Sequence, residues 1–308
     1  GRSVQDCLLM DVFFNPKYVG AKENFDTTRK SGWIAEELTN GRLTGVNLLD
    51  PESFLQKTGE IVESIHADDY INALKTGEPF SLASSQGFAW DPGIWSMALN
   101  STAGVLAAVD KAVSGNGTSG SLSSGLHHAS RDSGTGFCTV NGLVAAAQYA
   151  LEITDGIVVI LDVDAHCGGG THGMVAGQDR ILHLDLSVNR FDSYKPLGDN
   201  QLKILTRQTG QDLDHDYLNE LDQLLSTVPA DTSLVIYNAG MDPFPAISAE
   251  TLCERESMVA SWRKKVDVGL AFVLAGGYIS SMPKNELVDL HLHTLKVFSD
   301  SLLLSTSN

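Results

Sequence analysis

The sequence predicts an α/β protein with a mainly parallel, multi-stranded sheet flanked by helices. Short apolar runs rich in β-branched residues alternate with longer segments of helical apolar spacing, a pattern typical of parallel strands joined by helical crossovers. The chain has 308 residues, enough for one large α/β domain. Because neither a repeat nor a change in composition divides the sequence, we expect a single domain over residues 1–308.

The expected strands are short runs of apolar residues. They cover residues 7–14, 43–49, 61–65, 157–161, 180–186, 234–238 and 270–274. The stretch 114–125 is rich in Gly and Ser, as linkers are. It directly precedes a pair of histidines, however, so we expect a tight connection with one short strand there.

The expected helices are segments whose apolar residues recur every three or four positions. They lie near 33–38 and at 68–74, 94–113, 140–151, 213–225, 249–266 and 286–304. Asp26, Thr27 or Thr28 could cap the first of them. The stretches 81–92 and 187–211 are expected to be loops, which commonly control access to a site.

The composition argues against several classes of protein. The formal net charge of −17 is opposite to that of a nucleic-acid binder, and it favours cationic substrates at long range. No stretch reaches the roughly 20 apolar residues of a membrane span, and the first residues do not resemble a signal peptide. Cys7, Cys138, Cys167 and Cys253 show no paired spacing. We therefore expect a cytoplasmic protein with no membrane or direct nucleic-acid partner.

Residues 157–173 are the most informative stretch. An apolar run ends, and Asp162, Asp164 and His166 follow at every second position. Because strand side chains alternate, we expect these three to project from one face at the carboxyl end of a strand, where parallel α/β sheets bind ligands. Carboxylate and imidazole groups suit a divalent metal such as zinc. Alone, the pattern fits solvated acids at a strand end equally well.

Three further polar features lie in loops or just after strands: the pair His127 and His128, Asp242, and Tyr278. Taken singly, they have ordinary interpretations as surface histidines, a helix cap and a packed ring. Together with the acidic stretch above, they supply the parts of a metal-assisted amide hydrolase. These parts are three metal ligands with an open position, a histidine that moves a proton, and a tyrosine that donates to the developing oxyanion.

With these residues in place, the chain resembles the histone deacetylase superfamily, which has the arginase/deacetylase fold. The matching stretches occur in the family's order, at residues 25–30, 125–129, 136–141, 162–166, 238–242 and 276–278. Residues 26–30 and the segment from Ile247 through Arg255 and Glu256 look most like the smaller, single-domain deacetylases. The resemblance implies a hydrolase that acts on an acylated amine.

The resemblance also implies two metal sites. Asp164, His166 and Asp242 match the ligands of a catalytic Zn²⁺, or of Fe²⁺ in vivo. A structural monovalent cation, K⁺, is expected at a second site, formed by the backbone carbonyls of Asp162, Asp164, His166 and Leu186 with the side chain of Asp185. Serine is common in the family where this chain has Asp185.

The catalytic roles follow from the same matches. His128 matches the general base, and His127 matches its electrostatic or acidic partner. Asp162 matches the aspartate that orients His127, and Tyr278 matches the tyrosine that polarises the substrate carbonyl.

Substrate-binding residues are implied as well. Gly136 and Phe137 match the wall of a narrow acyl-lysine tunnel. Asp91 looks like the aspartate at the tunnel rim that grips the substrate backbone.

Two positions depart from the family pattern. Cys167 replaces a histidine that is not a ligand. Gly169 stands where the family usually has Asp or Asn hydrogen-bonded to the second histidine. We therefore expect water or a residue such as His172 to orient His128 instead, since an unoriented imidazole loses positioning and basicity.

Several functions remain open from the sequence. The first is removal of an acyl group from acyl-lysine in a peptide or protein, and the second is hydrolysis of an acetylated polyamine or another small amide. An arginase-like two-manganese site fits less well, because it would need a second Asp/His ligand set. Gly169 also leaves open a weakly active or inactive scaffold that binds acyl-lysine.

Overall fold

A computed structural model describes residues 9–22, 25–115, 117–206 and 212–303. In these residues the strands form one eight-stranded sheet in the order β2-β1-β3-β8-β7-β4-β5-β6, and all neighbouring pairs are parallel. The strands are β1 (Met10–Phe13), β2 (Val46–Leu49), β3 (Thr118–Ser121), β4 (Ile157–Asp162), β5 (Ile181–Ser187), β6 (Gln201–Ile204), β7 (Thr232–Gly240) and β8 (Gly269–Ala275). The predicted α/β fold with a parallel sheet is confirmed.

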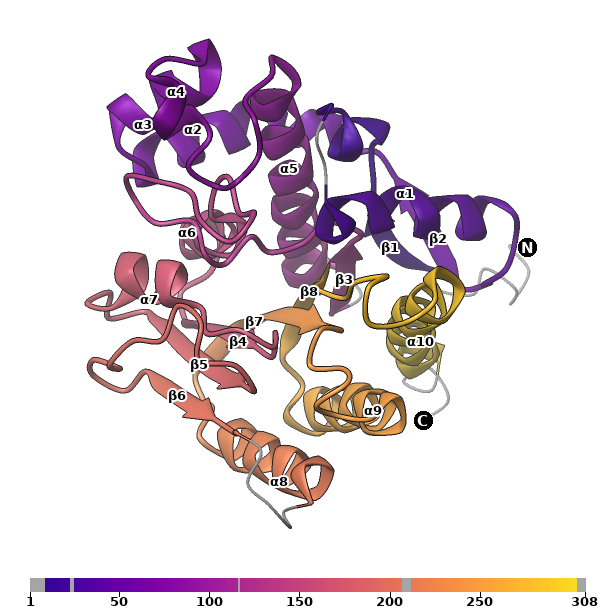
Figure 1. The fold of residues 1–308 in the computed structure, drawn as a ribbon. Coiled ribbons are helices and arrows are strands. Elements are labelled where there is room, and N and C mark those ends of the chain that lie inside the picture. Colours follow the sequence, from indigo (N-terminus) through magenta and orange to yellow (C-terminus); the bar gives the residue numbers. More distant parts are fainter. Residues whose placement is uncertain (1–8, 23–24, 116, 207–211, 304–308) are drawn as a thin grey trace.

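Helices cover both faces of the sheet (Figure 1). They are α1 (Asp26–Thr39), α2 (Leu55–Ile65), α3 (Asp68–Thr76), α4 (Phe80–Ala83), α5 (Gly93–Ser114), α6 (Gly142–Ile153), α7 (Gly169–Val175), α8 (Leu213–Ser226), α9 (Ala249–Val266) and α10 (Lys284–Leu303), with 3-10 turns at Pro16–Val19 and Glu52–Phe54. Helices α1, α8, α9 and α10 contribute to the core on one face, and α2, α3, α5 and α6 to the core on the other.

The two cores share the central strands. Along β4, Val159 and Leu161 belong to one core, whereas Val158 and Ile160 belong to the other. This alternation follows from the period of two in a strand, and both sets are apolar because the sheet is covered on both faces. The apolar run therefore produced a correct strand prediction.

The prediction of a strand at 61–65 was wrong, because this segment is the end of α2. Thr58, Ile61 and Val62 are buried together, at the i, i+3, i+4 spacing of one helical face. The expected loops also contain regular structure: α4 enters the first, and β6 lies within the second. Residues 7, 8, 116, 207–211 and 304 of the expected elements lie outside the described residues.

Four neighbouring strands, β3, β8, β7 and β4, lie at the centre of the sheet. Because all are parallel, their carboxyl ends meet at one edge, which is where ligands bind in open α/β sheets. Among the described helices, none is both long enough and apolar enough to cross a membrane.

Candidate active site

The carboxyl ends of the four central strands each lead into a polar segment. After β3 and β8 the chain carries the histidine pair and Tyr278, and after β7 and β4 it carries the three predicted metal ligands. The sheet order thus brings together residues that are up to 151 positions apart in the sequence, from His127 to Tyr278 (278 − 127).

Asp164, His166 and Asp242 form a candidate metal centre. Their ligand atoms all lie within 4.8 Å of one another. His166 Nδ1 lies 3.1 Å from Asp164 Oδ1 and 3.1 Å from Asp242 Oδ2. One imidazole and two carboxylates are a donor set that zinc accepts in sites with an open position.

The loop after β4 brings Asp164 and His166 together in a different way from the one expected. The strand ends at Asp162, so Asp164 and His166 are not strand residues and the argument from strand alternation does not hold for them. Each backbone amide instead donates to the preceding acid: Asp164 N to Asp162 Oδ1 at 3.2 Å, and His166 N to Asp164 Oδ1 at 3.0 Å. These short turns hold the two ligands in place.

The electrostatics of the centre favour a cation. Burial alone would lower the pKa of His166, but the adjacent carboxylates of Asp164 and Asp242 raise it to about 10. Burial, with the charge of Asp164, raises the pKa of Asp242. Asp242 Oδ2 is buried and accepts no well-aligned hydrogen bond from the described residues. An unsatisfied carboxylate oxygen beside an imidazole is a cost that a bound divalent ion would relieve.

His127 lies in a buried carboxylate environment. Its Nδ1 is 2.6 Å from Asp162 Oδ2, and its Nε2 is 3.4 Å from Asp164 Oδ1. Burial alone would lower the pKa of His127, but these two carboxylates raise it well above its usual value. Asn238 donates to the other oxygen of Asp162 at 2.7 Å. Asp162 thus directly contacts His127, and its orienting role stays a prediction.

The histidine pair is held by the start of α6. Asn141 accepts from Val144 N through its side-chain oxygen and so caps this helix. Its side-chain nitrogen donates to the carbonyls of His127 and Ala129, at 3.2 and 3.0 Å. The buried side chain of Asn141 therefore both caps α6 and holds the backbone beside His127 and His128.

His128 has a partner that the sequence did not suggest. Its Nδ1 lies 2.9 Å from Asp192 Oδ2, in the loop after β5. The expectation that His172 is this partner was wrong, because the ring of His172 stacks on Tyr194, with centroids 4.1 Å apart. Burial, and then the neighbouring His127, lower the pKa of His128.

Tyr278 is placed by the amino-terminal end of α1. Asp26, which is buried there, accepts from Ile279 N at 2.8 Å, and the ring of Phe25 lies 5.2 Å from that of Tyr278. Gly276 has φ +53°, and a Cβ at this position would lie 2.3 Å from Asp242 Oδ1. Burial, together with the charge of Asp242, raises the pKa of Tyr278, so its hydroxyl stays protonated and can donate.

A cavity of about 340 Å³ opens onto these groups. It is lined by Phe25, His128, Gly136, Phe137, His166, Phe191, Tyr278 and Ser280. The predicted wall residues Gly136 and Phe137 are among them, and both have left-handed backbone, with φ of +53° and +64°. The sequence prediction missed Phe25 and Phe191. The ring of Phe25 stacks on that of Phe137 with centroids 4.4 Å apart, and the ring of Phe191 is nearly perpendicular to that of His128 with centroids 4.9 Å apart.

Asp91 does not line this cavity. One of its carboxylate oxygens accepts from Lys22 N at 2.9 Å, and the other accepts from Gly93 N at 2.6 Å. Asp91 thus joins the start of α5 to the backbone of Lys22, which precedes α1, and its substrate-gripping role stays a prediction.

Asp185, which belongs to the predicted cation site, lies on β5 directly opposite Asp162 of β4. Its Oδ2 accepts from Gly168 N at 2.8 Å and from the Tyr194 hydroxyl at 3.0 Å, whereas its buried Oδ1 has no hydrogen-bond partner among the described residues. Burial, with the charge of Asp162, raises the pKa of Asp185 well above its usual range. These groups fit a monovalent cation, and its presence stays a prediction.

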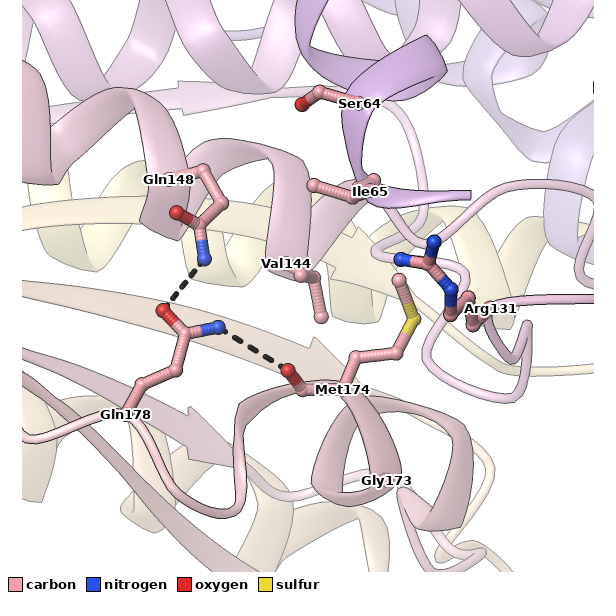
Figure 2. A pocket seen from close by; sticks show the side chains of 8 residues that line it. All are labelled: Ser64, Ile65, Arg131, Val144, Gln148, Gly173, Met174 and Gln178. Atoms are coloured by element: carbon pink, nitrogen blue, oxygen red, sulfur yellow. Dashed lines mark hydrogen bonds between the residues drawn. The ribbon is translucent and has the colours of Figure 1, made fainter. Parts of the chain in front are cut away.

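A second hollow lies between α7, α6 and the end of α2 (Figure 2), and it shares no lining residue with the cavity above. Its volume is about 350 Å³, and its described lining contains neither a carboxylate nor a histidine. Gln178 accepts from Gln148 at 2.8 Å and donates to the carbonyl of Met174 at 3.1 Å, so it joins α7 to α6 (Figure 2). The hollow lacks the groups needed for amide hydrolysis.

A family model for the histone deacetylase domain matches residues 27–295. The chain belongs to the histone deacetylase family. It is 24% identical to histone deacetylase 2 of Arabidopsis thaliana over 238 residues, covering 70% of this chain and 60% of that protein. It is also 27% identical to an uncharacterised protein of Picosynechococcus over 265 residues, covering 80% and 85% of the two chains.

Further relatives carry other names. The chain is 32% identical over 148 residues to the acetoin utilization protein AcuC of Staphylococcus aureus, covering 44% of this chain and 38% of that protein. A crystal structure of an acetylpolyamine aminohydrolase from Burkholderia pseudomallei has the same fold, with a TM-score of 0.74 and 16% identity over 94% of this chain and 98% of that one. This histone deacetylase family member therefore has the arginase/deacetylase fold that the sequence predicted.

Proposed function

We propose that the protein is a zinc-dependent deacylase that hydrolyses the amide bond between an acetyl or other acyl group and a lysine-like amine. The observation that carries this proposal is the convergence of Asp164, His166 and Asp242 beside one cavity that also holds His128 and Tyr278. Membership of the histone deacetylase family supports it.

The three ligands suit zinc, with Fe²⁺ as the alternative ion in vivo. A divalent ion held there supplies Lewis acidity, which polarises an amide carbonyl and acidifies water. The chain's own residues do the remaining work. The depressed pKa of His128 keeps its imidazole neutral and able to accept a proton from the attacking water.

His127 and Tyr278 complete the proposed mechanism. The raised pKa of His127 keeps a positive charge beside Asp162 and next to the reacting groups. Environments that push the pKa values of adjacent groups in opposite directions are typical of acid–base pairs. Tyr278 donates from its hydroxyl to the oxygen of the carbonyl as negative charge develops, and His128 returns its proton to the leaving amine.

The substrate is proposed to be an acyl-lysine peptide or protein. Phe25, Phe137 and Phe191 give the cavity apolar walls that suit the methylene chain of lysine. An acetylated polyamine is the second candidate, because the net charge of −17 favours a small polycation. Cys138, Cys167 and Cys253 are free, in line with the proposed cytoplasmic location.

The experiment is hydrolysis of a matched substrate panel by the zinc-loaded protein. The panel contains acetyl-lysine peptides, peptides with longer acyl chains, and acetylated polyamines, each assayed with and without a chelator. We expect chelator-sensitive release of the free amine, with the highest kcat/KM on one substrate class. A folded, zinc-loaded protein that hydrolyses none of these amides would overturn the proposal and favour a binding role.

A further inference from the structure

Two positions compete for the same space beside His128. At Gly169, the first residue of α7, a Cβ would lie 2.3 Å from both the carbonyl oxygen and Oδ1 of Asp192. Real Cβ atoms do not approach other atoms so closely. A side chain at 169 and the observed carboxylate of Asp192 therefore exclude each other.

The carboxylate of Asp192 is fixed by its surroundings. Its Oδ2 accepts from Gly170 N at 3.1 Å as well as facing His128 Nδ1 at 2.9 Å. The loop after β5 is also held at the residue before Asp192, because Cys167 N donates to the carbonyl of Phe191 at 3.1 Å. Asp192 has φ +58°, a left-handed conformation that Asp and Asn tolerate better than most residues.

We propose that Asp192 is the positioning residue of His128, supplied from the loop after β5 in place of a side chain at position 169. A carboxylate oxygen accepts a hydrogen bond, so its contact puts the proton of His128 on Nδ1 and leaves Nε2 free to accept one. Gly169 is then a requirement of this arrangement. The expected change in kcat rests on the proposed function, whereas the expected tautomer of His128 rests on the geometry alone.

The first test changes Asp192. Asp192→Gly removes the carboxylate and keeps a residue that adopts φ +58° without strain. Its kcat is expected to fall about 10- to 100-fold, the usual loss for a group that orients a catalytic ligand or base, with KM unchanged. Asp192→Asn retains an oxygen acceptor and is expected to keep most of the wild-type kcat. Asp199→Gly, on an exposed part of the same loop, is the matched control and should be neutral.

The second test changes Gly169. Gly169→Ala adds one methyl group where Asp192 lies, and it is expected to reproduce the loss of kcat. Gly173→Ala makes the same change in the same helix, at a position with no atom within 4 Å of the new methyl group. Gly173 borders the second hollow (Figure 2), and its variant should retain wild-type kcat.

Nitrogen-15 NMR of the histidine side chains in the metal-free protein separates positioning from catalysis. We expect a single His128 tautomer with the proton on Nδ1 in the wild type, in Asp192→Asn and in Gly173→Ala. Asp192→Gly and Gly169→Ala should show mixed tautomers. An unchanged tautomer in Asp192→Gly overturns the inference even where kcat falls, because the loop then acts only through its shape. A wild type that hydrolyses no amide but shows the expected tautomers defeats the proposed function and leaves the positioning role standing.

Discussion

Arg255 Nη1 donates to the carbonyl oxygen of Gly240 at 2.7 Å, two residues before Asp242. The guanidinium is fully buried, pairs with Glu256, and also lies 3.5 Å from the carbonyl of Val163. One side chain on α9 thus holds the carboxyl ends of β7 and β4, the two strands that lead to the candidate metal ligands.

Arg255→Met is expected to destabilise the protein strongly. The change leaves Glu256 as a buried, unpaired carboxylate, and breaking such a pair lowers the free energy of unfolding by about 3–5 kcal/mol. Urea denaturation measures this effect. Lys296→Met is the control, because it removes an exposed pair with Asp300 and should change the free energy of unfolding by less than about 1 kcal/mol. Similar losses in the two variants would contradict the role given to Arg255.

Tyr278→Phe removes one hydroxyl and leaves the ring that contacts Phe25. If this hydroxyl donates to the developing oxyanion, kcat should fall roughly 10²- to 10³-fold. Zinc content and melting temperature should stay at wild-type values, because Tyr278 is not among the candidate ligands. A variant that keeps wild-type kcat would exclude the proposed role of the hydroxyl.

Lys30 makes stability depend on pH. Burial lowers its pKa to about 7 in the folded protein, whereas an unfolded lysine titrates near 10.4. Between these values the unfolded chain binds more protons, so the free energy of unfolding rises with pH, by up to about 1.4 kcal/mol per unit. Metal-free wild type should therefore gain stability relative to Lys30→Met as the pH is raised from 7 to 10. A difference that stays constant over this range would show that Lys30 has an ordinary pKa.

Local patterns predicted the parts of the fold that depend on burial. The run at 157–161 is a strand because both faces of the sheet are covered. The predicted alternation of strands with helices holds for most of the chain, but β6 follows β5 with no helix between them. The strand prediction at 61–65 was wrong because the three apolar residues there fit the period of a helix as well as that of a strand. The strand β6 has four half-buried residues of mixed polarity at the sheet edge, and so short a pattern carries little signal.

The candidate site was predictable where its residues follow strands. Asp164, His166 and Asp242 come together because their strands are neighbours. Asp192 was not predictable, because its loop returns to α7 through backbone contacts that leave no pattern in the sequence. The one available signal was Gly169 itself: a glycine where a side chain is expected indicates that another group occupies the space.

The most direct test of the central claim is a zinc titration of the metal-free protein, followed by release of amine from an acetyl-lysine peptide. Activity should rise with zinc and level off at one ion per chain. Asp242→Asn should bind this ion more weakly and recover little activity at the same zinc concentration. Full activity in the metal-free protein, or zinc-dependent activity that Asp242→Asn leaves unchanged, would contradict a catalytic metal held by Asp164, His166 and Asp242.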